Sequence, residues 1–228
     1  MRAVITGLDR PSDNVKTGRM GQTFMLKKNK APTRDVKGAG CEGCDVWHKC
    51  YLFWGKAPMT VHRTAEADRY AFMGAWEEER LTQIPLRVGS AGEPTSVPYK
   101  VWKRLLALTP NWTGYTHKWR LPKFQNFKEF CMASVHSVEE AEEAWAMGWR
   151  TFRAGGEDEP SKREIECPNS TKGIQCADCT LCNGSTIKAN GLLKSIYIKG
   201  HGPWWQHNKP NERKYHGIND TLRSRAEG

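Results

Sequence analysis

Apolar residues recur along this chain in short runs with strand-like spacing and in longer stretches with a helical repeat. The sequence predicts strands at residues 23–28, 86–90, 114–118, 129–134, 149–154 and 195–201. It predicts helices at residues 61–75, 97–108 and 138–147, the second with Val97, Val101, Leu105 and Leu108 on one face. Ser137 precedes the third helix, with Glu140 at capping-box spacing. The alternation of strands and helices indicates an α/β protein with a largely parallel sheet.

Polar residues follow several of these strands, at the ends where functional groups collect in parallel sheets. They are Ser90, Gly92, Glu93, Thr116, His117, Ser134, His136 and Arg153. The arrangement fits a partial (βα) TIM-like barrel with a Cys-rich C-terminal segment. We expect the barrel core at residues 1–160, the second cysteine cluster and the last strand at 161–201, and a basic aromatic tail at 202–228. A structural role, as hydrogen-bonded or ion-paired side chains, is the alternative for His117, His136 and Arg153.

The charge and the apolar content of the chain limit the kinds of partner that we expect it to bind. The chain of 228 residues carries a formal net charge of +10 and has a mean hydropathy of −0.70. Basic residues and aromatic rings alternate in the tail, which makes nucleic acid a candidate partner; a solvated tail without a specific role is the alternative. No apolar run approaches the roughly 20 residues that span a membrane, and the N-terminus does not resemble a signal peptide. We therefore expect a cytoplasmic protein with reduced cysteines.

Seven of the eight cysteines form two groups. The first cysteine group is Cys41, Cys44 and Cys50, and the second cysteine group is Cys167, Cys176, Cys179 and Cys182. Three cysteines from one loop suit a [4Fe-4S] cluster with one open iron; zinc completed by His48 is the alternative. The second group has the spacing of ferredoxin-type cluster loops and predicts a fully ligated site for electron transfer or loop stapling. Cys131 stands alone and is expected to be a buried small apolar residue.

The first cysteine group, followed one strand later by Gly92-Glu93-Pro94, resembles the radical S-adenosylmethionine (radical SAM) enzymes. The resemblance implies that Cys41, Cys44 and Cys50 bind a [4Fe-4S] cluster, and that Gly92 and Glu93 bind the amino end of S-adenosylmethionine. Thr116, His117, Ser134 and Arg153 are then candidates for binding the rest of the cofactor or the substrate. Three features depart from the family pattern, one of which is a short barrel of about six strands. The cysteine spacing is two and then five residues, and Ala91 replaces the first glycine of the motif.

The chain up to His201 also resembles a group of cysteine-cluster proteins from phages and mobile elements, which brings no assigned activity with it. The shared segments include LRVGSAGEPTSVP, TGYTHKWR, CMASVHSVEEAEEAWAMGWRTFR and CADCTLCNG. Together the two resemblances imply a phage-encoded, radical-SAM-like iron–sulfur enzyme of the host cytoplasm. Its substrate would be a nucleotide, a nucleic acid or a peptide. The alternatives are a non-enzymatic nucleic-acid-binding protein stapled by zinc or Fe-S clusters, and an iron–sulfur redox or sensor protein.

Overall fold

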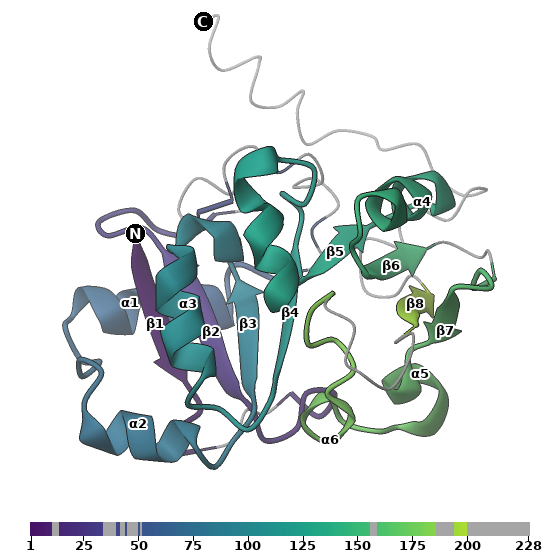
Figure 1. Ribbon diagram of the computed structural model, residues 1–228. Helices are drawn as coiled ribbons and strands as arrows, with labels where there is room; N and C mark the ends of the chain where they lie inside the picture. The colour runs from purple at the N-terminus through teal and green to yellow at the C-terminus, as the bar shows by residue number, and fades with distance from the viewer. Residues whose placement is uncertain are drawn as a thin grey trace, which may run out of the picture.

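The structure is a computed structural model that describes residues 1–10, 14–33, 40–41, 44, 50, 52–155, 159–185 and 194–199. Within these residues eight strands form one sheet in the order β1-β2-β3-β4-β5-β6-β8-β7 (Figure 1). The strands are β1 Arg2–Thr6, β2 Gly21–Leu26, β3 Leu86–Ala91, β4 Trp112–Thr116, β5 Met132–Val135, β6 Thr151–Gly155, β7 Glu164–Glu166 and β8 Ser195–Lys199. Only the pair of β1 and β2 is antiparallel. The described strands do not close into a ring, and β1 and β7 are the edges.

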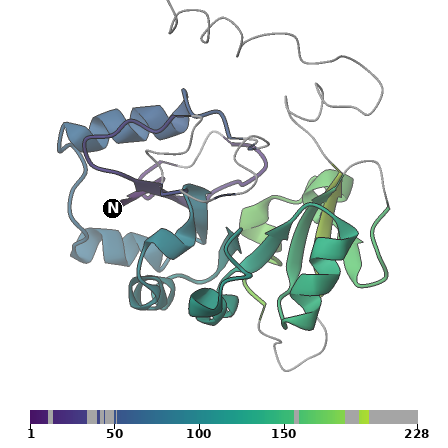
Figure 2. The ribbon, with the colours of Figure 1, turned by 90° about the horizontal axis from the view of Figure 1, so that it is seen from above.

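Helices connect the strands as parallel pairing requires. They are α1 Ala57–Glu66, α2 Ala75–Leu81, α3 Tyr99–Leu106, α4 Val138–Ala146, α5 Pro168–Lys172 and α6 Cys176–Cys179, with 3-10 turns η2 Pro94–Ser96 and η3 Pro122–Glu129. Seen from above, the earlier, purple-to-blue elements stand on one side of the molecule and the later, green ones on the other (Figure 2). The prediction of an α/β protein with a mostly parallel sheet is therefore confirmed.

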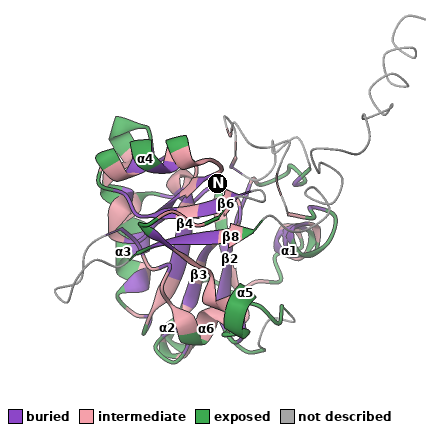
Figure 3. Cartoon of the chain, turned by 90° about the vertical axis from the view of Figure 1, so that its right-hand side faces the viewer, coloured by how far each residue is buried: buried purple, intermediate pink, exposed green. Residues whose placement is uncertain are grey.

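One face of the sheet packs against α3 and α4. Leu86 and Val88 of β3 and Ala133 and Val135 of β5 are fully buried there. The helices contribute buried Trp102, Leu106, Ala141 and Ala144 to the same core. Figure 3 shows the strands as the most deeply buried part of the chain. Because side chains alternate along a strand, residues 87 and 89 of β3 and residue 134 of β5 point to the other face of the sheet.

The six predicted strands are present, with ends shifted by up to three residues. The helix predicted at 61–75 is wrong in its second half. α1 ends at Glu66, Asp68 has a positive φ of 50°, and α2 begins only after the Gly74 N-cap. Sequence patterns did not predict the short strands β1 and β7. The tail, His48 and residues 200–201 lie outside the described residues.

Two details of the predicted helices also differ. In α3 the buried face is centred on Trp102 and Leu106, whereas Val101 itself is 49% exposed. At α4 the Ser137 hydroxyl accepts a hydrogen bond from the Glu140 backbone N–H at 3.2 Å, as predicted. The Glu140 carboxylate, however, accepts from the backbone N–H of His136 at 2.7 Å, one residue before the expected partner. The cap therefore also fixes the chain where it leaves β5.

Candidate functional site

A cavity of about 410 Å³ lies against the sheet face opposite to α3 and α4. Alternate residues of five parallel strands line it, as the two-residue repeat of a strand requires. They are Arg87, Gly89 and Ala91 of β3, Thr113 and Tyr115 of β4, Ser134 of β5, Phe152 and Ala154 of β6, and Ile196 and Ile198 of β8. The residues that follow β3, β4 and β5, namely Glu93, His117 and His136, line the same cavity.

All seven cysteines of the two groups line this cavity. All eight cysteines of the chain are free thiols. The first group follows the carboxyl end of β2. The second group is tied to the segment before the amino end of β2, because the Cys176 N–H donates to the Lys16 carbonyl at 3.0 Å. The Cys182 carbonyl in turn accepts from the Gly114 N–H of β4 at 3.0 Å, and α6 lies near the lower end of β4 in Figure 1. The first group thus follows the carboxyl end of β2 and Cys176 lies near the amino end of that strand, whereas Cys167 follows the carboxyl end of β7.

The Gly-Glu-Pro turn holds Glu93 in a fixed position at the end of β3. Gly92 has a φ of +89°, which a glycine adopts without strain, and the Trp102 indole N–H donates to the Pro94 carbonyl at 2.9 Å. The Glu93 carboxylate accepts three hydrogen bonds. The donors are the Thr116 hydroxyl at 2.6 Å, the His117 N–H at 3.1 Å and the Thr95 N–H at 3.3 Å. β4 therefore supplies two of the three groups that orient this side chain.

Burial raises the pKa of Glu93, since its side chain is almost completely enclosed. The three hydrogen bonds and the charge of Lys118 act in the opposite direction without cancelling the effect of burial. Burial also raises the pKa of the Cys41 thiol, and the negative charges of Glu93, Cys44 and Cys50 raise it further. Glu93 and Cys41 therefore act on one another across the cavity that both line, although 52 positions separate them in sequence.

The second cysteine group lies around a half-buried tyrosine. Tyr115 and Cys167 pack against the apolar cluster that contains the buried Cys182. Burial raises the pKa of Cys182 to about 12, the three other cysteines of the group raise it further, and the Tyr115 hydroxyl lowers it. Within the described residues, no three His, Cys, Asp or Glu side chains are placed to hold a single metal ion. The four cysteines of the second group line one cavity without being placed around a single point.

The structure divides the remaining predicted site residues between the two faces of the sheet. Ser134 and His117 line the cavity, and the His117 ring stacks with that of His136 at 5.7 Å between centroids. Thr116 and Arg153 are buried and do not line it. Thr116 bonds Glu93, while Arg153 forms a bidentate pair with Glu164. Both residues point to the face opposite to their cavity-lining neighbours along the strand.

Sequence reasoning missed many residues of the cavity wall, among them Arg87, Tyr115 and Phe152. Each lies inside a strand rather than at its end. The alternation of side chains along a strand could have identified them. Each lies two or four positions from another residue that points to the cavity face of its strand or follows that strand, so it belongs to the same face. Tyr115 and Phe152 face each other with ring centroids 4.6 Å apart.

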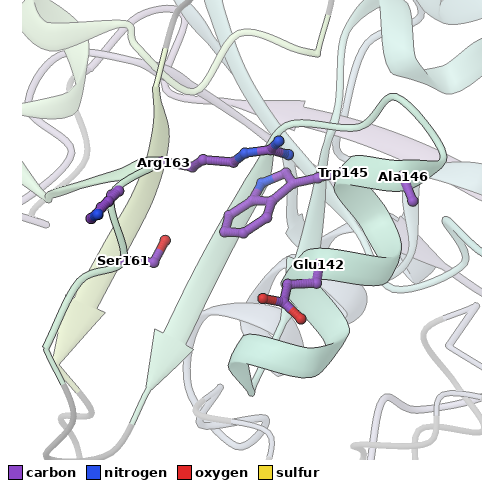
Figure 4. A pocket seen from close by; sticks show the side chains of 6 residues that line it. Glu142, Trp145, Ala146, Ser161 and Arg163 are labelled. Atoms are coloured by element: carbon purple, nitrogen blue, oxygen red, sulfur yellow. The ribbon is translucent and has the colours of Figure 1, made fainter.

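A second hollow of about 560 Å³ lies on the outer surface, between α4 and the segment before β7 (Figure 4). It is lined by Glu142, Trp145, Ala146, Ser161, Lys162 and Arg163. The Trp145 indole N–H donates to the Ser195 hydroxyl at 2.9 Å, and the Arg163 guanidinium lies 5.4 Å from its ring centre. These contacts join α4 to the edge strands, and we assign no chemistry to this hollow.

Comparisons with known proteins give no match: no family model, no curated protein and no solved structure matches the chain. In the described part of the chain, no helix has the length and apolar character that a membrane span requires.

Proposed function

We propose that the protein is a radical-SAM-like iron–sulfur enzyme, with the first cysteine group and Glu93 as its cofactor site. One observation carries the proposal. The loop after β2 and the turn after β3 bring Cys41 and Glu93 into electrostatic reach at the wall of one cavity. β2 and β3 are parallel neighbours, so their carboxyl ends stand side by side. This is the placement that the resemblance to radical SAM enzymes implies.

The first cysteine group suits an iron–sulfur cluster in its chemistry and its surroundings. Thiolates are the usual ligands of such clusters, and three of them leave one iron open for a further ligand. Cys41 and Cys50 pack against an apolar cluster that includes Phe24, Trp54 and Val61. Apolar side chains therefore lie beside two of the three cysteines, in keeping with the dry surroundings that chemistry with reactive carbon radicals requires. When bound, the cluster and S-adenosylmethionine would supply one-electron cleavage that generates such a radical.

Glu93 suits the ammonium group of S-adenosylmethionine. A carboxylate offers about four acceptor positions, and three donors from the protein occupy three of them. Among the described residues, Oε1 accepts from Thr116 and Thr95, and Oε2 accepts from the His117 N–H. Beside these donors, Oε2 has room for one cationic N–H donor. His117 and Ser134, which line the same cavity, are our candidates for contacts to the rest of the cofactor or to the substrate.

The sheet is interpreted as a partial (βα) barrel. Side chains from β3, β4, β5, β6 and β8 line a single cavity, which a flat sheet does not enclose. In this interpretation the missing part of the wall is supplied by the two cysteine segments and by residues 14–16. The phage origin and the nucleotide, nucleic-acid or peptide substrate, both expected from the sequence, belong to the same proposal.

Equilibrium dialysis with S-adenosylmethionine on anaerobically reconstituted protein tests the proposal. Glu93→Gln keeps the size of the side chain and removes the charge. Because a hydrogen bond to a charged group contributes about 1.5–3 kcal/mol, we expect the Kd to rise about 10- to 150-fold. Glu143→Gln is the matched control, since Glu143 pairs with Arg120 on the surface. Cys41→Ser should lose about four irons and the binding of S-adenosylmethionine.

Two results contradict the proposal. One is a reconstituted wild-type protein that contains no iron bound at the first cysteine group, so that Cys41→Ser has the same iron content. The other is an unchanged Kd for S-adenosylmethionine in Glu93→Gln. Zinc in the wild-type protein together with binding of nucleic acid would support the non-enzymatic alternative instead.

A further inference from the structure

We propose that His117 and His136 form an oxyanion subsite for the substrate of the proposed enzyme, next to an apolar wall that binds the body of the same molecule. The substrate class is thus an aromatic or aliphatic group that carries a carboxylate or a phosphate. The inference deepens the proposed function and rests on it for the identification of the ligand as the substrate. Anion binding by the two imidazoles itself requires no cofactor.

The two histidines follow neighbouring parallel strands. His117 comes directly after β4 and His136 directly after β5, and both side chains line the cavity. Their rings lie nearly parallel, with planes 13° apart and centroids 5.7 Å apart. A neutral imidazole offers one N–H donor and a protonated one offers two, whereas a carboxylate has two acceptor oxygens. Two rings at this separation can therefore both donate to a single carboxylate or phosphate group.

Backbone hydrogen bonds fix both histidines before any ligand binds. The His117 N–H donates to Glu93 Oε2 at 3.1 Å, and the His136 N–H donates to Glu140 Oε2 at 2.7 Å. These bonds use main-chain groups of the histidines rather than their imidazoles. A ligand that binds to the rings therefore does not have to order this part of the backbone, and avoids the entropic cost of doing so.

The charged side chains of the cavity favour an anionic ligand. Among the described residues that line it, three are lysine or arginine and one is a carboxylic acid, namely Lys16, Arg87 and Lys199 against Glu93. In the proposed function, Glu93 pairs with the ammonium group of the cofactor, so its charge does not repel the substrate. Clefts lined by one sign of charge raise the local concentration of ligands of the opposite sign. The lining therefore favours a negatively charged substrate over a neutral one.

An apolar wall adjoins the histidine pair. Ser134 of β5 lies opposite Phe152 of β6, and Phe152 lies opposite Ile196 of β8. Two residues further along the strands, Ala154 lies opposite Ile198. All five residues line the cavity. The polar and the apolar parts of the cavity floor thus meet at Ser134, so a ligand that contacts both has an anionic end and an apolar end.

The sheet order separates this wall from the residues that we assign to the cofactor. Cys41 and Glu93 follow β2 and β3, whereas the apolar wall belongs to β6 and β8, with β4 and β5 between them. The two histidines follow these middle strands. A substrate bound to His117 and His136 would therefore extend away from the cofactor site, toward β8.

Isothermal titration calorimetry with four small probes tests the inference. Phenyl phosphate and phenylacetate combine a ring with an oxyanion, benzyl alcohol lacks the anion, and inorganic phosphate lacks the ring. Each probe is titrated into the whole chain before and after anaerobic reconstitution, and again with saturating S-adenosylmethionine. The variants His117→Phe and His136→Phe keep a ring but remove its N–H donors. His117→Gln and His136→Gln are the matched controls, because glutamine supplies an N–H donor again.

We expect both aromatic anions to bind about tenfold or more tightly than benzyl alcohol and inorganic phosphate, because each of these two lacks one half of the contacts. Each change to phenylalanine should raise the Kd of the aromatic anions about tenfold or more, and that of benzyl alcohol by less than about threefold. The glutamine variants should recover most of the lost affinity. Saturating S-adenosylmethionine should not displace the anions. The tighter of the two aromatic anions identifies the oxyanion as phosphate or carboxylate.

Three results would overturn the inference. Benzyl alcohol that binds as tightly as the anions would exclude an oxyanion subsite. Unchanged affinities in His117→Phe and His136→Phe would place the anions elsewhere; if circular dichroism shows that one of these variants does not fold, the other decides. Displacement of the anions by S-adenosylmethionine would assign the histidine pair to the cofactor. A protein that binds the two anions but not S-adenosylmethionine would refute the proposed function alone and leave the oxyanion subsite in place.

Discussion

The ion pair between Arg153 and Glu164 allows a direct test of whether Arg153 stabilises the fold or contributes to the cofactor site. Both side chains are completely buried. The Arg153 Nε donates to Glu164 Oε1 at 2.9 Å, and Nη2 donates to Oε2 at 2.8 Å and to the Glu159 carbonyl at 3.1 Å. The guanidinium also lies 4.4 Å from the ring centre of Tyr197. The pair joins β6 to the edge strand β7, on the face opposite to the cavity.

Replacing Arg153 with methionine leaves the Glu164 carboxylate buried, with the Ser161 N–H at 2.9 Å as its remaining donor among the described residues. Removing one partner of a buried pair lowers the free energy of unfolding by about 3–5 kcal/mol. For a chain of this size, each kcal/mol corresponds to about 2–4 °C in the unfolding temperature. We therefore expect Arg153→Met to unfold about 6–20 °C below the wild type.

Calorimetry or circular dichroism measures this shift in the protein without cofactors. The double variant Arg153→Met, Glu164→Leu is the control, because it removes both charges and should recover about 2 kcal/mol or more relative to Arg153→Met. The folded fraction of Arg153→Met should bind S-adenosylmethionine as the wild type does. A variant that melts within about 2 °C of the wild type but loses cofactor binding would refute our reasoning, and would support the cofactor role that the sequence suggested for Arg153.

Three further predictions concern the turn after β3. Thr116→Val removes the hydroxyl that orients Glu93, so equilibrium dialysis should show a Kd for S-adenosylmethionine about tenfold higher, whereas Thr116→Ser should be close to wild type. Gly89 has a φ of +78°, and a Cβ at this position would lie 3.0 Å from Pro94. Urea unfolding of Gly89→Ala should therefore show a free energy of unfolding lower by about 1–3 kcal/mol. Gly173→Ala, with φ +68° and open space, should lose less. The difference in free energy of unfolding between apo Glu93→Gln and the apo wild type should shift in favour of the variant as pH rises above the ordinary carboxyl pKa of 4.5. The reason is that burial raises the pKa of Glu93 in the folded apo protein, so its ionisation costs more free energy there than in the unfolded chain. Thermal unfolding curves that keep a constant difference between the two proteins from pH 4 to 8 would contradict this.

The sequence predicted the sheet better than the helices. The parallel strands carry compact apolar runs between turn residues, and β3 was placed to within one residue of its end. The helix at 61–75 failed because apolar residues continue past Glu66, whereas the backbone turns at Asp68. β1 and β7 have five and three residues, and neither carries a pattern long enough to detect. Cys131 is completely buried, as its isolated position suggested.

The candidate site was predictable only in part, because the position of a residue at the end of a strand does not determine to which face of the sheet its side chain points. Thr116 and His117 are adjacent, yet only His117 lines the cavity. Phe152 and Ala154 point into it, and Arg153 between them points away. The grouping of both cysteine clusters around one cavity depends on contacts between residues more than 100 positions apart, such as that of Cys176 with Lys16. No local pattern carries that information.

The bond network around residues 14–17 has a consequence for how the protein matures. The Gln175 side chain donates to the Val15 carbonyl, a contact that spans 160 positions, and Ala177 pairs with Thr17. A growing chain can assemble β1 to β4 and the first cysteine group long before these partners exist. The opposite wall forms only when the last third of the chain has been synthesised, since contacts of such long range close late. The order of synthesis would then also set the order in which the proposed metal sites form, with the first cysteine group complete before the second.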